Sequence, residues 1–414
     1  MQDSGKKHLL KISQLAQKAG VSIPTVKHYV REGLIPRPVK TSRNMAYYPE
    51  ADIHRIRLVK KLQKEKFLPL EVIKRLLDKG ESFDEELPPP DSQDKSKAYL
   101  PDLNAIQRAA SRIAPYAHRT PVMTCDSLDR MTGARLSFKC ENFQKIGAFK
   151  FRGALNAVLS LEPKAAERGV VTHSSGNHAQ ALALAARLKG MNATIVMPEN
   201  APKVKIAAVK EYGAEVILCT PTLEAREAGV REVIQRTGAE LIHPYDDVRV
   251  IAGQATCAME FLQQVPDMDF IMAPVGGGGL LSGTALSTHF ISSRTRVIAA
   301  EPELADDASQ SFQTKTFVPA GPPRTIADGL LTSLGEITLP LILEYVNDIV
   351  TVSEQNIITA MYSIWERMKI VVEPSGAVPL GAVIEHADRF KGRHVGIILS
   401  GGNVDLQKLL STFC

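Results

Sequence analysis

The sequence predicts an α/β fold with largely parallel sheets, preceded by a small and mostly helical domain. Residues 98–414 alternate short apolar runs with Ala-rich helical stretches, which is the pattern of strands and crossover helices. The first 80 residues hold 18 Lys and Arg against 7 Asp and Glu, whereas the remainder holds 32 against 38. This charge asymmetry indicates an anionic macromolecular partner for the first domain.

The composition is typical of soluble globular proteins, with 44% hydrophobic and 23% charged residues in 414 positions. No apolar run reaches the about 18 residues that a membrane-spanning helix needs, and the N-terminus is too polar for a secretory signal. The five cysteines are scattered and form no C-x-x-C pair. We therefore expect a cytoplasmic protein with reduced thiols and no membrane partner.

The basic end begins with KISQLAQKAGVSIPTVKHYVREGLIP, residues 11–36, which predicts two helices joined by a tight turn at Gly20. Ser22 can cap the second helix, and Pro24 fits its first turn. Two more amphipathic helices are expected after an intervening loop. That loop carries Arg43, Asn44, Tyr47 and Tyr48.

The order helix-turn-helix, wing and helical support over residues 1–80 resembles the winged DNA-binding domain of the MerR family of regulators. The resemblance implies that the second helix enters the major groove of double-stranded DNA while basic residues contact phosphates. A small helical domain with a solvated basic face is the alternative. The residues expected to contact DNA are Lys27, His28, Arg31, Arg43 and Tyr47.

Residues 81–98 form an acidic, Pro-rich stretch that we interpret as a flexible linker. In the MerR family a long dimerisation helix follows the DNA-binding domain, and here the linker takes its place. We therefore expect a homodimer that forms through the large domain.

Three loops in the large domain carry polar or glycine-rich sequences directly after apolar runs: THSSGNHAQ at 172–180, VGGGG at 275–279 and LSGGN at 399–403. Ligands bind at the carboxyl ends of parallel strands, so these loops are candidates for one site. Glycines allow backbone N–H groups at a helix start to face a phosphate. Lys150 lies between two phenylalanines at a predicted helix start, and desolvation there favours an amine that can form a Schiff base.

These motifs, with HRTPV, VIAGQATCAME, TIADGL and WERMKIVVEPSGAV, resemble the fold-type II pyridoxal-phosphate (PLP) enzymes, and within them the serine racemase and serine/threonine ammonia-lyase family. The resemblance covers residues 99–414. It implies two open, mainly parallel α/β subdomains, the smaller at roughly 145–250 and inserted in the larger. It also implies pyridoxal 5'-phosphate as the cofactor.

The resemblance assigns a role to each site residue. Lys150 would bind the cofactor and act as a base on one face of the substrate Cα, with Ser175 on the opposite face. The cofactor contacts would come from Lys150, Asn177, Gly276, Gly277, Gly278, Gly279, Leu280 and Ser400. The substrate carboxylate would meet Ser174, Ser175, Gly176 and His178. Arg226 aligns with an arginine that can meet a second carboxylate, and a place on a helix surface is an equal alternative.

A structural cation, Mg²⁺ or in its place Ca²⁺ or Mn²⁺, is also implied, with Glu301, the Ala305 carbonyl and Asp307 as ligands. Two solvated acids are the alternative. Three positions depart from the family pattern: Ile146 and Ala148 replace hydroxyl residues near Lys150, and Tyr245 replaces an asparagine of serine racemase. The changes at Ile146 and Tyr245 argue against an ATP effector site.

The expected reaction is the conversion of a β-hydroxy amino acid (threonine, serine or 3-hydroxyaspartate) to a 2-oxo acid and ammonia, with serine racemisation as an additional activity. The complete set of cofactor residues favours catalysis. The alternative is a transcriptional regulator in which the PLP fold senses an amino acid or the cofactor. The fused DNA-binding domain and the changed residues near Lys150 keep that alternative open.

Overall fold

The structure is a computed structural model that describes residues 9–31, 33–42, 45–65, 74, 77, 100–322 and 324–405. The chain divides into two compact units, residues 1–98 and 99–414. The expected linker and Arg43 lie outside the described residues. The elements described in the first unit are β1 (Leu9–Lys11), α1 (Ile12–Ala19), α2 (Ile23–Arg31), β2 (Val39–Ser42), β3 (Met45–Pro49) and α3 (Asp52–Glu65).

The helix-turn-helix of the first unit forms as the sequence predicts. Gly20 ends α1 with φ 69°, a left-handed conformation that costs glycine little. The backbone N–H of Thr25 then donates to Ser22 Oγ at 3.2 Å, which caps α2. The strands pair antiparallel in the order β1-β3-β2, so β2 and β3 form the wing hairpin.

Tyr47 and Tyr48 lie in strand β3, and the expectation that they belong to a loop is therefore wrong. Successive residues of a strand face opposite sides. Tyr48 is accordingly buried, whereas Tyr47 is only half-buried. Tyr48 thus belongs to the core of this small unit.

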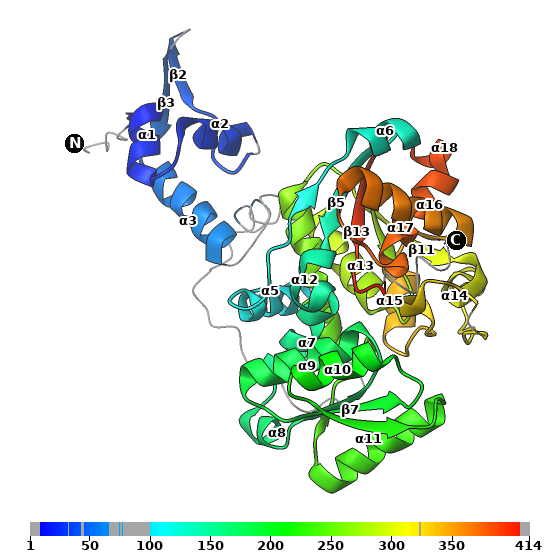
Figure 1. Ribbon diagram of the computed structural model, residues 1–414. Helices are drawn as coiled ribbons and strands as arrows, with labels where there is room; N and C mark the ends of the chain where they lie inside the picture. Colours follow the sequence, from blue (N-terminus) through cyan, green and yellow to red (C-terminus); the bar gives the residue numbers. More distant parts are fainter. Residues whose placement is uncertain are drawn as a thin grey trace. The chain divides into compact units, whose positions relative to one another are not determined.

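The second unit contains two sheets (Figure 1). The larger has the order β12-β11-β10-β13-β5-β4 and the smaller has the order β8-β7-β6-β9. Every pairing is parallel except that of β4 with β5. The strands are β4 (Val122–Met123), β5 (Arg135–Cys140), β6 (Val170–His173), β7 (Ala193–Pro198), β8 (Glu215–Cys219), β9 (Glu240–Leu241), β10 (Phe270–Pro274), β11 (Arg296–Pro302), β12 (Asp348–Val352) and β13 (His394–Leu399).

Helices cover both sheets, with α9 and α10 on one face of the smaller sheet and α11 on the other (Figure 1). The α-helices are α5 (Leu103–Ile113), α6 (Asp126–Thr132), α7 (Lys150–Leu159), α8 (Pro163–Glu167), α9 (Asn177–Lys189), α10 (Lys203–Glu211), α11 (Leu223–Thr237), α12 (Val248–Gln264), α13 (Gly279–Ile291), α14 (Asp307–Thr314), α15 (Thr338–Tyr345), α16 (Glu354–Ser363), α17 (Pro374–Glu385) and α18 (Ala387–Phe390). Short helical turns are η1 (Glu141–Phe143), η2 (Lys145–Gly147), η3 (Glu303–Ala305), η4 (Asp328–Leu330) and the π-helical η5 (Ile364–Met368). None of the described helices is long and apolar enough to cross a bilayer.

Close helix packing in the second unit depends on two glycines. A Cβ at Gly253 of α12 would lie 2.5 Å from the carbonyl oxygen of Arg152 in α7, and one at Gly283 of α13 would lie 2.6 Å from the backbone N of Ala255. Neither backbone neighbour can move aside as a flexible side chain could. The two glycines therefore set how closely α12 approaches the helix that carries Lys150 and the helix that follows the glycine loop.

Candidate active site

The three loops identified from the sequence each follow the carboxyl end of a parallel strand: β6, β10 and β13. Lys150 begins α7, and its segment is attached to the end of β13. The backbone N–H of Phe149 donates to the Ser400 carbonyl at 3.0 Å, and Ala148 pairs with Gly401 in a β-bridge. The structure therefore brings Lys150 and Ser400 together, although 250 residues separate them in the sequence.

Lys150 is a desolvated amine. Its Nζ donates to the carbonyl oxygen of Pro244 at 2.9 Å and lies 5.2 Å from the ring centre of Phe149. Burial lowers the pKa of Lys150 to about 8, and the nearby charge of Glu373 opposes this shift. The unprotonated fraction of the amine near neutral pH is therefore much larger than at the usual lysine pKa, which makes it a better nucleophile.

The loop Gly276–Gly279 forms a cradle that only glycine fits. Gly278 has φ 89°, and a Cβ at Gly277 would lie 2.3 Å from the ring of Tyr245. A Cβ at Gly276 would lie 2.9 Å from the backbone of Leu330. The first N–H groups of α13, including that of Leu280, have no partner within an α-helix and can bind an anion.

The donor set suits pyridoxal phosphate. The cradle and the start of α13 suit a phosphate, and Lys150 provides the amine that an aldehyde needs. Ser400 is buried at the end of β13, where a hydroxyl can meet a ring nitrogen. The residues present therefore fit the cofactor that the sequence implied.

The serine-rich loop connects β6 to α9. Ser174 N–H donates to the Val196 carbonyl at 3.2 Å, and Gly176 N–H donates to Ser174 Oγ at 3.3 Å, with Ser175 between them. His178 is buried, and its Nε2 donates to the Ile242 carbonyl at 3.1 Å. Burial holds the pKa of His178 well below its usual value, so this imidazole is neutral. The imidazole of His178 therefore bonds to the backbone after β9, and the N–H of Ala179 in the first turn of α9 bonds to the Gly176 carbonyl at 3.1 Å.

Arg226 lies in α11 and is half-buried. Its Nε donates to the Thr222 carbonyl at 3.3 Å. Burial is the main cause that lowers the pKa of His173, and the positive charge of Arg226 lowers this pKa further. The same charge opposes the rise in the pKa of Tyr245, which burial causes. The charge of Arg226 therefore acts on His173 and Tyr245.

Three rings border the site. His173 and His243 meet edge to face at 5.8 Å, and His243 and Tyr245 do so at 4.7 Å. Tyr245 packs over the glycine loop and also interacts with the Thr332 side chain. The sequence comparison marked Tyr245 as a departure but did not predict its contact with the glycines.

Sequence reasoning missed Glu373 as a site residue. This carboxylate is buried beside Asn177, whose Nδ2 donates to both of its oxygens at 3.0 and 3.2 Å. A signal was present, because Glu373 interrupts the apolar run IVVEPSGAV directly before a proline that starts a helix. An acid in such a run needs a partner when it is buried.

The residues proposed for a cation lie around η3. Glu301 Oε1 and Oε2 accept from the backbone N–H groups of Ala308 and Ser309 at 2.9 and 2.7 Å. Burial raises the pKa of Glu301 to about 9 and that of Asp307 to about 6. In the described part of the chain, no donor meets the buried Asp307 Oδ2, and no group of three or more His, Cys, Asp or Glu forms a ready metal cluster.

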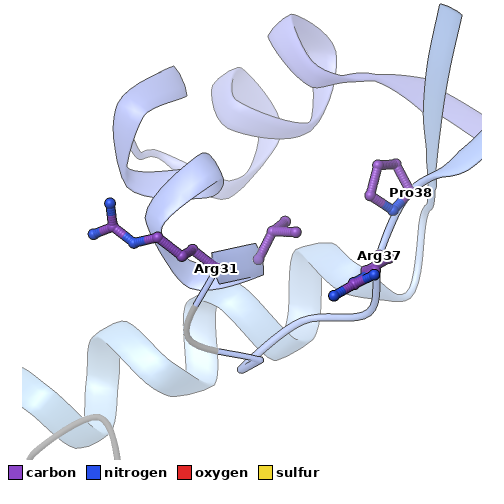
Figure 2. Close-up of a pocket in the computed structure, with 4 residues that line it drawn as sticks. Arg31, Arg37 and Pro38 are labelled. Carbon is purple, nitrogen blue, oxygen red and sulfur yellow. The ribbon is translucent and has the colours of Figure 1, made fainter. Parts of the chain in front are cut away.

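The first unit presents a basic surface around α2. Lys27 and Arg31 are exposed, and Arg31 Nη2 lies 2.9 Å from His28 Nδ1. Figure 2 shows Arg31 at the end of α2, and Arg37 and Pro38 on the loop that follows. With Val30, these residues line an open hollow of about 510 Å³.

A half-buried, phenylalanine-flanked lysine and a glycine cradle, both next to the carboxyl ends of parallel strands, are features that define the class of fold-type II PLP enzymes. Residues 113–401 match the family model described as pyridoxal-phosphate dependent enzyme, and the chain belongs to this family. The predicted fold class and family are therefore confirmed. Residues 10–80 match the MerR HTH family regulatory protein model.

Known relatives cover the second unit almost completely. The β-hydroxyaspartate dehydratase of Paracoccus denitrificans is 48% identical over 311 residues, which is 75% of this chain and 99% of the relative. The serine racemase of Arabidopsis thaliana is 50% identical over 320 residues, 76% of this chain and 97% of the relative. The crystal structure of serine racemase from Dictyostelium discoideum has a TM-score of 0.71 and 46% identity, and the match covers 74% of this chain and 99% of that one.

Proposed function

We propose that the second unit is a PLP-dependent ammonia-lyase for β-hydroxy amino acids and that the first unit binds DNA. The observation that carries the enzymatic proposal is the desolvated Lys150, whose Nζ bonds to the Pro244 carbonyl next to Tyr245, the residue that packs on the cradle Gly276–Gly279. Bound pyridoxal phosphate supplies the electron sink that makes the proton on the substrate Cα acidic. Serine at position 400 is uncharged, so it does not hold a proton on the pyridine nitrogen as an aspartate would. This favours expulsion of a β-hydroxyl over a long-lived carbanion.

The protein groups have separate tasks in this reaction. The N–H groups at the start of α9 and the loop Ser174–Gly176 hold the substrate carboxylate. Lys150 Nζ accepts the Cα proton on one face, and Ser175 Oγ lies on the other, where proton return gives racemisation. The β-hydroxyl leaves as water after taking up a proton. Hydrolysis of the released enamine then gives a 2-oxo acid and ammonia.

Borohydride reduction followed by peptide mapping tests the identity of the nucleophile. We expect the reduced cofactor to be attached to Lys150, and attachment elsewhere would refute the assignment. A panel of serine, threonine and 3-hydroxyaspartate then tests the reaction, with 2-oxo acid release as the readout. If none of them turns over while DNA binding responds to an amino acid, the sensor alternative is favoured.

We place 3-hydroxyaspartate first among the substrates because Arg226 lies within electrostatic reach of the site. The likeness to a β-hydroxyaspartate dehydratase supports this choice. Arg226→Gln should raise KM for 3-hydroxyaspartate by about 10- to 100-fold, the size of a lost charge-assisted contact. Serine has no second carboxylate, so its KM should change little. An unchanged KM for 3-hydroxyaspartate would favour the alternative that Arg226 only lies on a helix surface, and an equal rise for both substrates would exclude a contact with the second carboxylate.

We also propose a structural cation, Mg²⁺ or Ca²⁺, held by Glu301, the Ala305 carbonyl and Asp307. The buried and unpartnered oxygen of Asp307 supports this proposal, since a hard cation prefers oxygen ligands. Chelation should lower Tm, and Mg²⁺ should restore it. Asp307→Asn should abolish the response to chelator. An unchanged Tm in the wild-type protein would contradict the proposal.

The first unit is proposed to place α2 in the major groove of double-stranded DNA, as a homodimer joined through the second unit. The MerR match and the exposed Lys27 and Arg31 on α2 support this proposal. A gel shift on the upstream DNA of its own gene should show binding that weakens steeply with salt. The double change Lys27→Ala and Arg31→Ala should abolish it. Lys18→Ala is the control, because Lys18 lies on α1 and pairs with Glu50 at 2.7 Å.

A further inference from the structure

Four groups form a hydrogen-bonded chain beside Lys150. Asn403 Nδ2 donates to the carbonyl oxygen of Ile146 at 2.6 Å and to Asn177 Oδ1 at 2.9 Å. Asn177 Nδ2 in turn donates to the two carboxylate oxygens of Glu373 at 3.0 and 3.2 Å. Glu373 is only 5% exposed, and Asn177 and Asn403 are half-buried.

The two ends of this chain fix its direction. A carbonyl oxygen and a carboxylate can only accept hydrogen bonds, whereas an amide side chain has one accepting and one donating end. Asn403 must therefore turn its Nδ2 toward Ile146, and Asn177 must turn its Nδ2 toward Glu373. A glutamine at position 373 could either accept from Asn177 or donate to it, so only the bond from Asn403 would then set the orientation of Asn177.

The chain connects segments that together build the site. Asn177 starts α9, which packs on the smaller sheet, whereas Asn403 follows β13 of the larger sheet and Glu373 precedes α17. Ile146 lies four residues before Lys150 and has φ 60°, a left-handed conformation that costs a β-branched residue energy. Its bond to Asn403 helps to hold that conformation. Gly401 leaves room for the carboxylate, because a Cβ there would lie 2.5 Å from Glu373 Oε1.

We propose that Glu373 is a positioning residue: it fixes the amide of Asn177 so that the second N–H of Nδ2 is presented to the 3-oxygen of the cofactor. This inference rests on the proposed function, in which Asn177 contacts that oxygen. Glu373 itself touches neither cofactor nor substrate, and it acts through Asn177. An amide held in advance loses less freedom when the cofactor binds.

The charges around Glu373 agree with this role. Burial raises the pKa of Glu373 to about 7, the charge of Asp328 raises it further, and the Asn177 bond and Lys205 oppose the shift. The charges of Lys150 and Glu373 also attract each other. Above that pKa the carboxylate can only accept and helps to fix Asn177, whereas below it the protonated group can also donate, and the constraint from this end of the chain is lost. Lys205 and Asp328 pair with each other at 2.9 Å, which limits their effect.

The test uses the full-length protein and the change Glu373→Gln. The Kd for pyridoxal phosphate should rise by about tenfold, the difference between a charged and a neutral hydrogen bond. The absorption spectrum of the bound cofactor should change, and kcat should fall while KM changes little. Glu385→Gln is the matched control, since Glu385 ends the same helix and accepts from Asn356 Nδ2 at 3.0 Å outside the site. It should leave Kd and spectrum unchanged.

A double-mutant cycle separates positioning from general stabilisation. In an Asn177→Ala background, Glu373→Gln should have no further effect on Kd or spectrum, and additive effects would overturn the inference. If Glu373→Gln does not fold, Asn403→Ala tests the other end of the same chain and should give the same spectral change. Wild-type protein that fails to bind the cofactor would refute the proposed function instead. If the wild-type protein binds the cofactor and Glu373→Gln has the same Kd and spectrum as the wild type, only this inference is refuted.

Discussion

The sharpest stability prediction concerns Arg152, two residues after Lys150 in the first turn of α7. Its guanidinium donates to both oxygens of Glu141 at 2.7 and 2.8 Å and to both oxygens of Glu260 at 2.8 and 2.9 Å. Longer contacts reach Thr256 Oγ1 and the His118 carbonyl, each at 3.3 Å. Arg152 and Glu141 are fully buried, and Glu260 is nearly so, with 17% of its side chain exposed.

Arg152→Met removes the charge and keeps a side chain of similar length. Lys139 Nζ would still meet Glu260 at 2.8 Å, but Glu141 would lose both of its bonds to Arg152. Removing one partner of a buried ion pair costs about 3–5 kcal/mol, because the remaining charge stays desolvated. That loss should lower Tm by on the order of 10 °C.

The loss should depend on pH in a defined direction. Burial acts to raise the pKa of Glu260, but Arg152 and Lys139 outweigh it and hold this pKa below its usual value. In the wild-type protein this carboxylate therefore stabilises the fold above its unfolded pKa, and the stabilisation is lost as pH falls through the folded value. In the variant Glu260 would lose the charge of Arg152 and would protonate more readily. The difference in Tm between the two proteins should consequently narrow as pH falls from 7 toward about 4.

Thermal unfolding by circular dichroism measures this effect, with Arg249→Met as the control. Arg249 also contacts two acids, Asp247 at 2.7 Å and Glu240 at 2.9 Å, but its side chain is 28% exposed. Its loss should cost about 1 kcal/mol, as for a solvent-accessible pair. The account of the buried network is wrong if Arg152→Met lowers the free energy of unfolding no more than Arg249→Met does. It is also wrong if the difference in Tm between the wild type and Arg152→Met does not narrow in acid.

Three further predictions concern single positions. Because the pKa of Lys150 is lowered to about 8, capture of pyridoxal phosphate by the apoprotein should accelerate with pH and level off near that value, and a rise continuing to pH 10 would contradict the burial. Gly253→Ala should destabilise the protein by about 1–3 kcal/mol in thermal unfolding because the added methyl meets the backbone of α7. Gly321→Ala, where a Cβ meets nothing within 4 Å, should have little effect. Ser22→Ala should cost α2 about 1 kcal/mol through loss of its cap, seen as faster hydrogen exchange in that helix, and unchanged exchange would refute the cap.

The sequence predicts much of this fold because its local signals agree with one another. Gly20 and Ser22 mark the end of one helix and the start of the next: Gly20 forms the expected turn and Ser22 the expected cap. The apolar runs before the three loops become buried parallel strands. The wing hairpin was harder to predict from the sequence, because a short hairpin has little hydrophobic periodicity. Tyr47 and Tyr48 lie in its second strand, and their opposite exposure follows from pairing that no local pattern shows.

The site could be predicted where chemistry lies in contiguous motifs, as with Lys150 and Gly276–Gly279. It could not be predicted where the contacts are between side chains far apart in sequence. Glu373 meets Asn177 across 196 residues, and Tyr245 meets Gly277 only because the chain returns over the cradle. The imidazole of His178 shows the same limit, because its bond to Ile242 depends on how β9 ends.

Position 146 shows why the departures from the family motif are part of a consistent local structure. A hydroxyl residue there could bond through its side chain, but Ile146 has only its backbone to offer, and its carbonyl binds Asn403. The isoleucine side chain is buried in the core of the smaller subdomain with Phe151. Apolar burial thus stabilises the side chain while the amide of Asn403 holds the strained backbone in place. Ile146→Thr would weaken the apolar burial and keep the bond from Asn403 to the backbone carbonyl. We therefore expect lower thermal stability with an unchanged cofactor spectrum. An altered spectrum would show that the isoleucine side chain itself positions Lys150.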